Sequence, residues 1–309
     1  CCIYLLYLIL KKHSSPLAGL IGASLTVCYP VLFYTAGTLY PQTFGTLLFL
    51  LILFLLPQRE ANATMPFFLV GLIFGYLILT IPNFIFPLLL VVLWIMFSLR
   101  TVRVKAAIVV FSVAFLVVAI WSVRHYKVFN SFVFVSTNSG YNLLLGNSEN
   151  ATSNSGVNVD ISKYSVNTVG MDEVKRDSYY RSKAIEFILE NKLQATKLYL
   201  LKVINNFNFR NELATKTEAS SKKDIIMFLT YGIFLILFLF RVFSFKRLKP
   251  SSIELLFVTL YLSNAFFSAI FFTRIRFRLP FDFLLITIVA IYIYNLLLSS
   301  KIFISARGN

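Results

Sequence analysis

The 309-residue chain is 58% hydrophobic and only 14% charged, with a mean hydropathy of +0.77. A soluble core of this length does not need so much apolar surface, so the composition excludes an ordinary soluble domain and indicates a multi-span membrane protein. The net charge of +16 is scattered over loops and one hydrophilic segment. Because nucleic-acid binding requires a basic face on a soluble domain, we expect no nucleic-acid partner.

The apolar runs predict about nine membrane segments, since a bilayer span takes about 20 apolar residues. In chain order they cover residues 1–10, 17–35, 39–56, 66–79, 84–98, 106–121, 225–240, 253–272 and 279–298. Residues 65–99 carry no charge, and one helix of that length would be about 52 Å long, so we expect a break at Thr80-Ile81-Pro82-Asn83. The chain begins with Cys1-Cys2-Ile3 inside an apolar run. We therefore expect it to be truncated at its amino end.

Loop charges predict the orientation of these segments. Twelve basic residues outside the hydrophilic segment fall on one side: Lys11, Lys12, Arg59, Arg100, Arg103, Lys105, Arg241, Lys246, Arg247, Lys249, Lys301 and Arg307. Three fall on the other side: Arg274, Arg276 and Arg278. Because basic loops favour the cytoplasm, we expect these three arginines outside it.

Three regions follow from this topology: transmembrane helices at 1–121, an extracytoplasmic region at 122–224, and carboxyl-terminal transmembrane helices at 225–309. Residues 131–137 alternate like a short strand, and residues 138–155 have the composition of a loop. The apolar spacing over 177–207 predicts two helices that meet near Asn191, lying on the membrane face or on each other. The expected fold is an all-α polytopic membrane protein with one mixed α/β extracytoplasmic region.

The three arginines are the leading candidates for a functional site. A guanidinium group is planar, permanently charged and able to bind phosphate through two hydrogen bonds. Arg274, Arg276 and Arg278 are therefore expected to hold the head of a polyprenyl phosphate whose tail stays in lipid. The alternatives are a simple helix-end anchor or an error in the topology.

Two neighbouring stretches could extend such a site. Arg124 and His125 follow Trp121 where the chain leaves the membrane. Arg124 would join the phosphate site, with His125 as a hydrogen-bond partner that binds substrate, or the pair would serve as an interfacial anchor. Hydroxyl and amide groups between residues 136 and 147 supply the mixed donors and acceptors that sugars require, although a turn-rich loop has the same composition. The expected sugar-contacting side chains are Asn138, Tyr141, Asn142 and Asn147.

The sequence predicts no metal centre and no disulfide framework of its own. The cysteines Cys1, Cys2 and Cys28 lie in or beside apolar runs, and two histidines are too few for a histidine-built metal site.

Three stretches together resemble membrane glycosyltransferases of the GT-C fold. The first runs from Tyr29-Pro30 through Tyr34, Gly37 and Leu39-Tyr40-Pro41-Gln42. The second and most specific comprises Trp121-Ser122-Val123-Arg124-His125-Tyr126, Phe129, Ser136-Thr137-Asn138-Ser139-Gly140-Tyr141-Asn142-Leu143 and Gly146-Asn147. The third is Arg276-Phe277-Arg278-Leu279-Pro280. The likeness is to enzymes that use polyprenyl-phosphate sugars, such as aminoarabinose transferases and dolichyl-phosphate-mannose–protein mannosyltransferases.

The resemblance implies transfer of a sugar from a polyprenyl monophosphate to a glycan, lipid or protein acceptor, usually with inversion. It implies a multi-pass protein of the cell (plasma or inner) membrane, with Arg124, Arg276 and Arg278 on the carrier phosphate. The family's catalytic carboxylate would lie upstream of Cys1, so no catalytic residue is assigned in this chain. No cofactor is certain, and a divalent metal is compatible with the family. Gln42 and Ile81 depart from the family, which commonly has an acidic and a basic residue there.

Two other functions stay open at this point. An O-antigen-polymerase-like enzyme would also use outward-facing arginines and a long external loop, but on diphosphate-linked glycans. A transporter is a third reading, although the sequence shows no internal repeat and little charge within its spans.

Overall fold

The computed structural model describes residues 1–38, 40–57, 64–99, 102–154, 156, 158–210 and 221–307. Leu39, Arg59 and Arg100, which the topology prediction used, lie outside the described residues. The chain divides into two compact units. Unit 1 comprises Cys1–Ala114, Lys222–Tyr261 and Leu279–Asn309, and unit 2 comprises Phe115–Ser221 and Leu262–Arg278.

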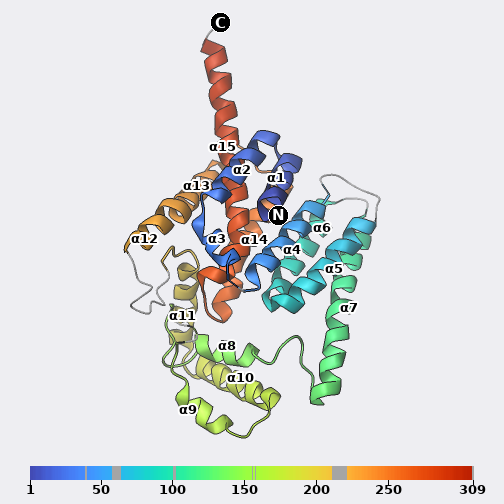
Figure 1. The fold of residues 1–309 in the computed structure, drawn as a ribbon, viewed down its shortest axis with the longest axis vertical. Helices are drawn as coiled ribbons and strands as arrows, with labels where there is room; N and C mark the ends of the chain where they lie inside the picture. Colours follow the sequence, from blue (N-terminus) through green and yellow to red (C-terminus); the bar gives the residue numbers. More distant parts are fainter. Residues whose placement is uncertain are drawn as a thin grey trace. The chain divides into compact units, whose positions relative to one another are not determined.

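Apolar helices build unit 1. Those of its amino-terminal part are α1 (Cys2–His13), α2 (Pro16–Val27), α3 (Pro30–Ala36), α4 (Gln42–Leu55), α5 (Met65–Thr80), the short 3₁₀ helix η1 (Pro82–Phe84), α6 (Ile85–Ser98) and the first part of α7 (Arg103–Phe129). Its later helices are the joined α12 (Ser221–Met227), η3 (Phe228–Gly232) and α13 (Ile233–Phe243), then η4 (Ser244–Lys246), the first half of α14 (Ser252–Ile270) and α15 (Ile275–Arg307) from Leu279 onward. The end of α14 and the start of α15 belong to unit 2. Figure 1 shows α1 and α2 side by side, and α4 beside α5.

The prediction of about nine membrane segments is wrong. Among the described residues, four helices are long and apolar enough to cross a membrane: Arg103–Phe129, Ser221–Lys246, Ser252–Ile270 and Ile275–Ser299. A fifth span results only if α2 and α3, which are bent by 68° at Cys28-Tyr29, count as one. The helices α4, α5 and α6 have 14 to 16 residues, or about 21–24 Å, which is shorter than a 30 Å hydrocarbon core. Prolines and loops divide the apolar runs into short helices. A prediction from apolar composition alone counts each of these short helices as a membrane span.

The expected break in the run 65–99 is confirmed. α5 ends at Thr80, Ile81 is extended with φ −138° and ψ 95°, and Pro82 opens η1. The residue before a proline is pushed out of the helical region, which explains the position of the break.

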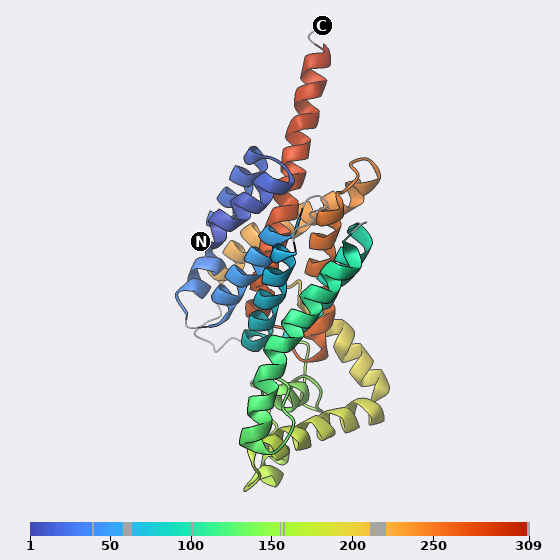
Figure 2. The ribbon, with the colours of Figure 1, turned by 90° about the vertical axis from the view of Figure 1, so that its right-hand side faces the viewer.

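Unit 2 contains the end of α7 and the helices α8 (Ser139–Gly146), α9 (Ser162–Ser165), η2 (Val166–Thr168), α10 (Glu173–Glu190) and α11 (Lys192–Asn205). α10 and α11 meet at a corner (Figure 2), with Asn191 between them as the sequence predicted. Residues 138–155, expected as a loop, contain α8 instead. The side chain of Asp177 on α10 accepts hydrogen bonds from the amides of Gly140 (2.6 Å) and Tyr141 (3.2 Å), which satisfies donors that the first turn of α8 leaves free.

The predicted mixed α/β region is wrong, because the described residues contain no strand. Residues 131–137 do alternate in burial: Val133 and Val135 are buried, whereas Phe132 and Phe134 are exposed. Side chains of α7 occupy two of the segment's carbonyls, since the Trp121 indole donates to Val135 O at 3.2 Å and the Ser122 hydroxyl to Phe134 O at 2.7 Å. The segment packs on a helix end instead of pairing with a second strand.

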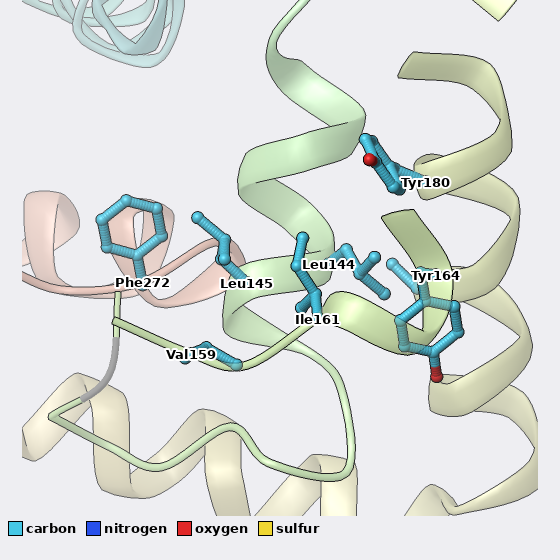
Figure 3. Packing of buried hydrophobic residues seen from close by; sticks show 8 residues of the cluster. Leu144, Leu145, Val159, Ile161, Tyr164, Tyr180 and Phe272 are labelled. Atoms are coloured by element: carbon cyan, nitrogen blue, oxygen red, sulfur yellow. The ribbon is translucent and has the colours of Figure 1, made fainter. Parts of the chain in front are cut away.

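The core of unit 2 joins α8, α9 and α10 to the segment between α14 and α15. It consists of Leu144, Leu145, Val159, Ile161, Tyr164, Tyr180, Ala184 and Phe272. Figure 3 shows Phe272 beside Leu145 in this cluster. Because Phe272 stands two residues before Arg274, this packing fixes the segment with the arginines against the core of unit 2.

Candidate functional site

The candidate site is the arginine turn, which we define as residues 271–278; it comprises the segment 271–274 that follows α14 and the first turn of α15, which begins at Ile275. Besides the packing of Phe272, two hydrogen bonds fix the beginning of this turn. The Asn147 amide donates to Ile270 O at 2.9 Å, and Asn205 of α11 donates to the Thr273 hydroxyl at 3.0 Å. Together with buried Phe272, these bonds connect the turn to both α8 and α11.

Lys202 of α11 forms the most buried of these attachments. Its side chain is 0% exposed, and its ammonium donates to Phe271 O (2.8 Å), Gly146 O (3.0 Å) and Asn147 Oδ1 (3.3 Å). Burial lowers the pKa of Lys202 to about 7, because a low-dielectric site disfavours the charged form. The lysine thus joins the end of α8, the last turn of α11 and the first residue of the turn.

Arg278 is buried and attached to the end of α11. Its Nη1 atom donates to Asn206 O at 2.6 Å and to Asn208 O at 2.9 Å, and the side chain is 1% exposed. The last carbonyls of a helix lack partners within the helix and carry partial negative charge, so a guanidinium group there is stabilising. These contacts give Arg278 a positioning role.

Arg274 is placed differently, because its half-buried side chain keeps a free donor. Its guanidinium packs so closely on Gly156 that a Cβ atom there would collide with it, and it lies 5.9 Å from the Phe272 ring centre. Its buried Nη1 atom has no hydrogen-bond partner among the described residues. Burial, and then the positive charge of Arg276, lower the pKa of Arg274 to about 10.

Arg276 is also half-buried, with its guanidinium 5.1 Å from the centre of the Phe277 ring. The turn therefore presents two guanidinium groups that are partly accessible, Arg274 and Arg276, beside one that is enclosed, Arg278. Such a site has the chemistry of an anion receptor, since a buried donor without a partner is costly unless a ligand satisfies it.

The other side chains expected at the site serve several purposes. Asn147 is buried, with its amide bonded to Leu143 O and Ile270 O, so it pins α8 to the turn. Tyr141 packs edge-on against Tyr180 at 5.7 Å. Asn138 is exposed just before α8, and Asn142 is half-buried within it.

Arg124 and His125 lie near the end of α7. Arg124 is exposed, with its guanidinium 4.9 Å from the centre of the Trp121 ring. His125 is buried between Trp121 and Phe129, at ring-centre distances of 4.9 and 5.7 Å. No contact that the structure reports for the described residues joins Arg124 or His125 to the arginine turn.

Sequence reasoning missed Lys202, Asn205 and Asn206, none of which it named as a candidate. A signal was present: Lys202 continues the helical spacing of Ala195 and Leu198, both of which are buried. A lysine aligned with small and apolar residues on one helix face indicates an enclosed ammonium.

The described residues contain no group of three or more His, Cys, Asp or Glu side chains placed to hold a metal ion. The metal that the family resemblance allows therefore has no such ligand set in this part of the chain.

Comparison of the chain with protein-family models, curated proteins and solved structures finds no match.

Proposed function

We propose that this protein is a membrane glycosyltransferase of the GT-C type that transfers a sugar from a polyprenyl monophosphate to an extracytoplasmic glycan, lipid or protein. The observation that carries the proposal is the unpartnered Nη1 atom of half-buried Arg274, in a turn with two further arginines. The four helices that are long and apolar enough to span a membrane support a lipid-linked donor. With these four spans, the basic residues Arg247 and Lys249 lie between the second and third spans and the turn joins the third span to the fourth, so an inward position of the basic loop supports an outward-facing turn in the plasma or inner membrane.

The arginines have different roles in this proposal. Arg274 and Arg276 contact the carrier phosphate, whereas Arg278 and Lys202 fix the turn against α11. During transfer a hydroxyl or amine of the acceptor gives its proton to a general base, for which no residue of this chain is assigned, and attacks C1 of the sugar, while the electron pair of the breaking C1–O bond leaves with the phosphate. The guanidinium groups stabilise the negative charge that develops on the departing phosphate, which lowers the barrier to transfer.

The test is sugar transfer by the full chain in liposomes, with a polyprenyl-monophosphate sugar as donor. We expect Arg274→Ala to lower kcat/KM roughly 10²-fold, as the loss of one donor to a developing anion does in other enzymes. Arg176→Ala removes an exposed arginine of α10 in the same unit and should leave transfer unchanged.

Three outcomes bear directly on the proposal. Transfer from monophosphate-linked sugars that depends on Arg274 supports it. Activity only on diphosphate-linked repeats would instead identify a polymerase-like enzyme. Full transfer by the Arg274→Ala variant would refute the assigned role of the turn.

A further inference from the structure

α11 carries apolar residues on both its buried and its exposed face, unlike an amphipathic helix on the surface of a soluble protein. Its inward face carries Ala195, Leu198 and the charged Lys202, all buried. Its outward face carries Leu193, Leu200 and Ile204, which are 86%, 54% and 68% exposed.

The three exposed side chains form one stripe, which we call the outer stripe of α11. Their spacings of seven and four residues place them on the same side of a helix with 3.6 residues per turn. Lys197 falls on the same side and is also exposed. An exposed apolar stripe of this kind, interrupted by one lysine, is typical of an interaction surface.

The contacts of α11 indicate what covers this stripe. On its inward side, the Tyr199 hydroxyl donates to Phe266 O of α14 at 3.1 Å, and Lys202 donates to Phe271 O just after α14 ends. Because α14 is one of the helices long and apolar enough to span a membrane, α11 lies against the end of a candidate span. The end of a membrane-spanning helix lies at the level of the lipid headgroups, so α11 would lie at that level too.

The charges of α11 favour lipid over a protein partner. Its exposed charged residues are Lys192 and Lys197, and the helix contains no aspartate or glutamate. Lysine attracts anionic headgroups, and its long stem lets the ammonium reach the phosphate level while its neighbours enter the acyl region.

We propose that α11 lies flat in the interface of an anionic bilayer, with the outer stripe among the acyl chains and Lys197 among the lipid phosphates. This position of α11 in the bilayer goes beyond the proposed function and does not depend on sugar transfer. It would hold the arginine turn, which is attached to the inward face of α11, close to the headgroup layer.

The test uses the full chain in vesicles of phosphatidylcholine and phosphatidylglycerol, with Cys1, Cys2 and Cys28 replaced by serine. Leu200→Cys and Ile204→Cys each receive a bimane fluorophore, and exposed Arg176→Cys on α10 is the matched control. Quenching by a phosphatidylcholine spin-labelled high on its acyl chain is compared with quenching by aqueous iodide.

We expect lipid quenching at 200 and 204 to exceed the control by about threefold or more, and iodide quenching to be weaker than at the control, as for interfacial helices. Strong iodide quenching at both positions without lipid quenching would overturn the proposal. Protection from both quenchers would also overturn it, because a protein surface, either a second copy or a partner, would then cover the stripe.

Discussion

Replacing Lys202 by methionine tests how the arginine turn is held. The substitution keeps a long stem but removes the ammonium, so the buried carbonyls of Gly146 and Phe271 lose a donor at 3.0 and 2.8 Å. Each unsatisfied buried carbonyl costs about 1–3 kcal/mol. The variant no longer buries an amine, which offsets part of this cost. We expect a net loss of about 2–4 kcal/mol in the free energy of unfolding at pH 7.

The pH dependence gives this prediction a second readout. The pKa of Lys202 is about 7 in the folded protein, against an ordinary value of 10.5. Between these values the unfolded chain binds more protons than the folded one, so this group makes the parent more stable as pH rises. The variant lacks that gain, and the difference in stability between parent and variant should therefore grow from pH 7 to pH 9.

Thermal unfolding in detergent micelles measures both effects. At about 2–4 °C per kcal/mol, Lys202→Met should lower Tm by roughly 10 °C at pH 7. The matched control Lys192→Met removes an exposed lysine from the same helix and should change Tm by no more than roughly 2 °C. A Tm of the Lys202 variant equal to that of the parent at both pH values would refute the reasoning.

Three further substitutions probe other contacts. Gly146→Ala should destabilise by about 1–3 kcal/mol, because its Cβ would collide with the carbonyl that opens the arginine turn, whereas Gly37→Ala has room; equal Tm values for the two variants would contradict this. Asp177→Ala removes the acceptor at the start of α8 and should cost about 1–2 kcal/mol, visible as faster hydrogen exchange in α8, and unchanged exchange would argue against the cap. Arg241 donates to Glu254 at 2.7 and 2.8 Å in a buried pair. Arg241→Met should therefore cost about 3–5 kcal/mol, and Arg241→Met with Glu254→Leu should recover most of it; a double variant no more stable than the single one would refute the pairing.

Helix boundaries were predictable from the sequence where one residue type determines the backbone. Pro82 places the break after α5, and Asn191 separates α10 from α11, as the sequence indicated. The number of spans was not predictable from apolar length, because the short helices α4, α5 and α6 have the same composition as a span.

The roles of individual residues at the turn required the tertiary structure. The sequence indicated an arginine cluster, but the enclosure of Arg278 depends on the carbonyls of Asn206 and Asn208, more than 60 residues away. Likewise, the apolar spacing of α11 correctly predicted a helix. The buried face is the one with Lys202, because its three acceptors come from α8, Asn147 and the turn.

Binding of a polyprenyl monophosphate to the purified full chain tests the central claim most directly. Titration calorimetry in micelles compares this ligand with the corresponding polyprenol, for the parent protein and for Arg274→Gln. We predict that the parent prefers the phosphate by about tenfold or more, as a charge-assisted guanidinium contact would give, and that Arg274→Gln loses most of this preference. Equal preference for the phosphate in both proteins would contradict the account.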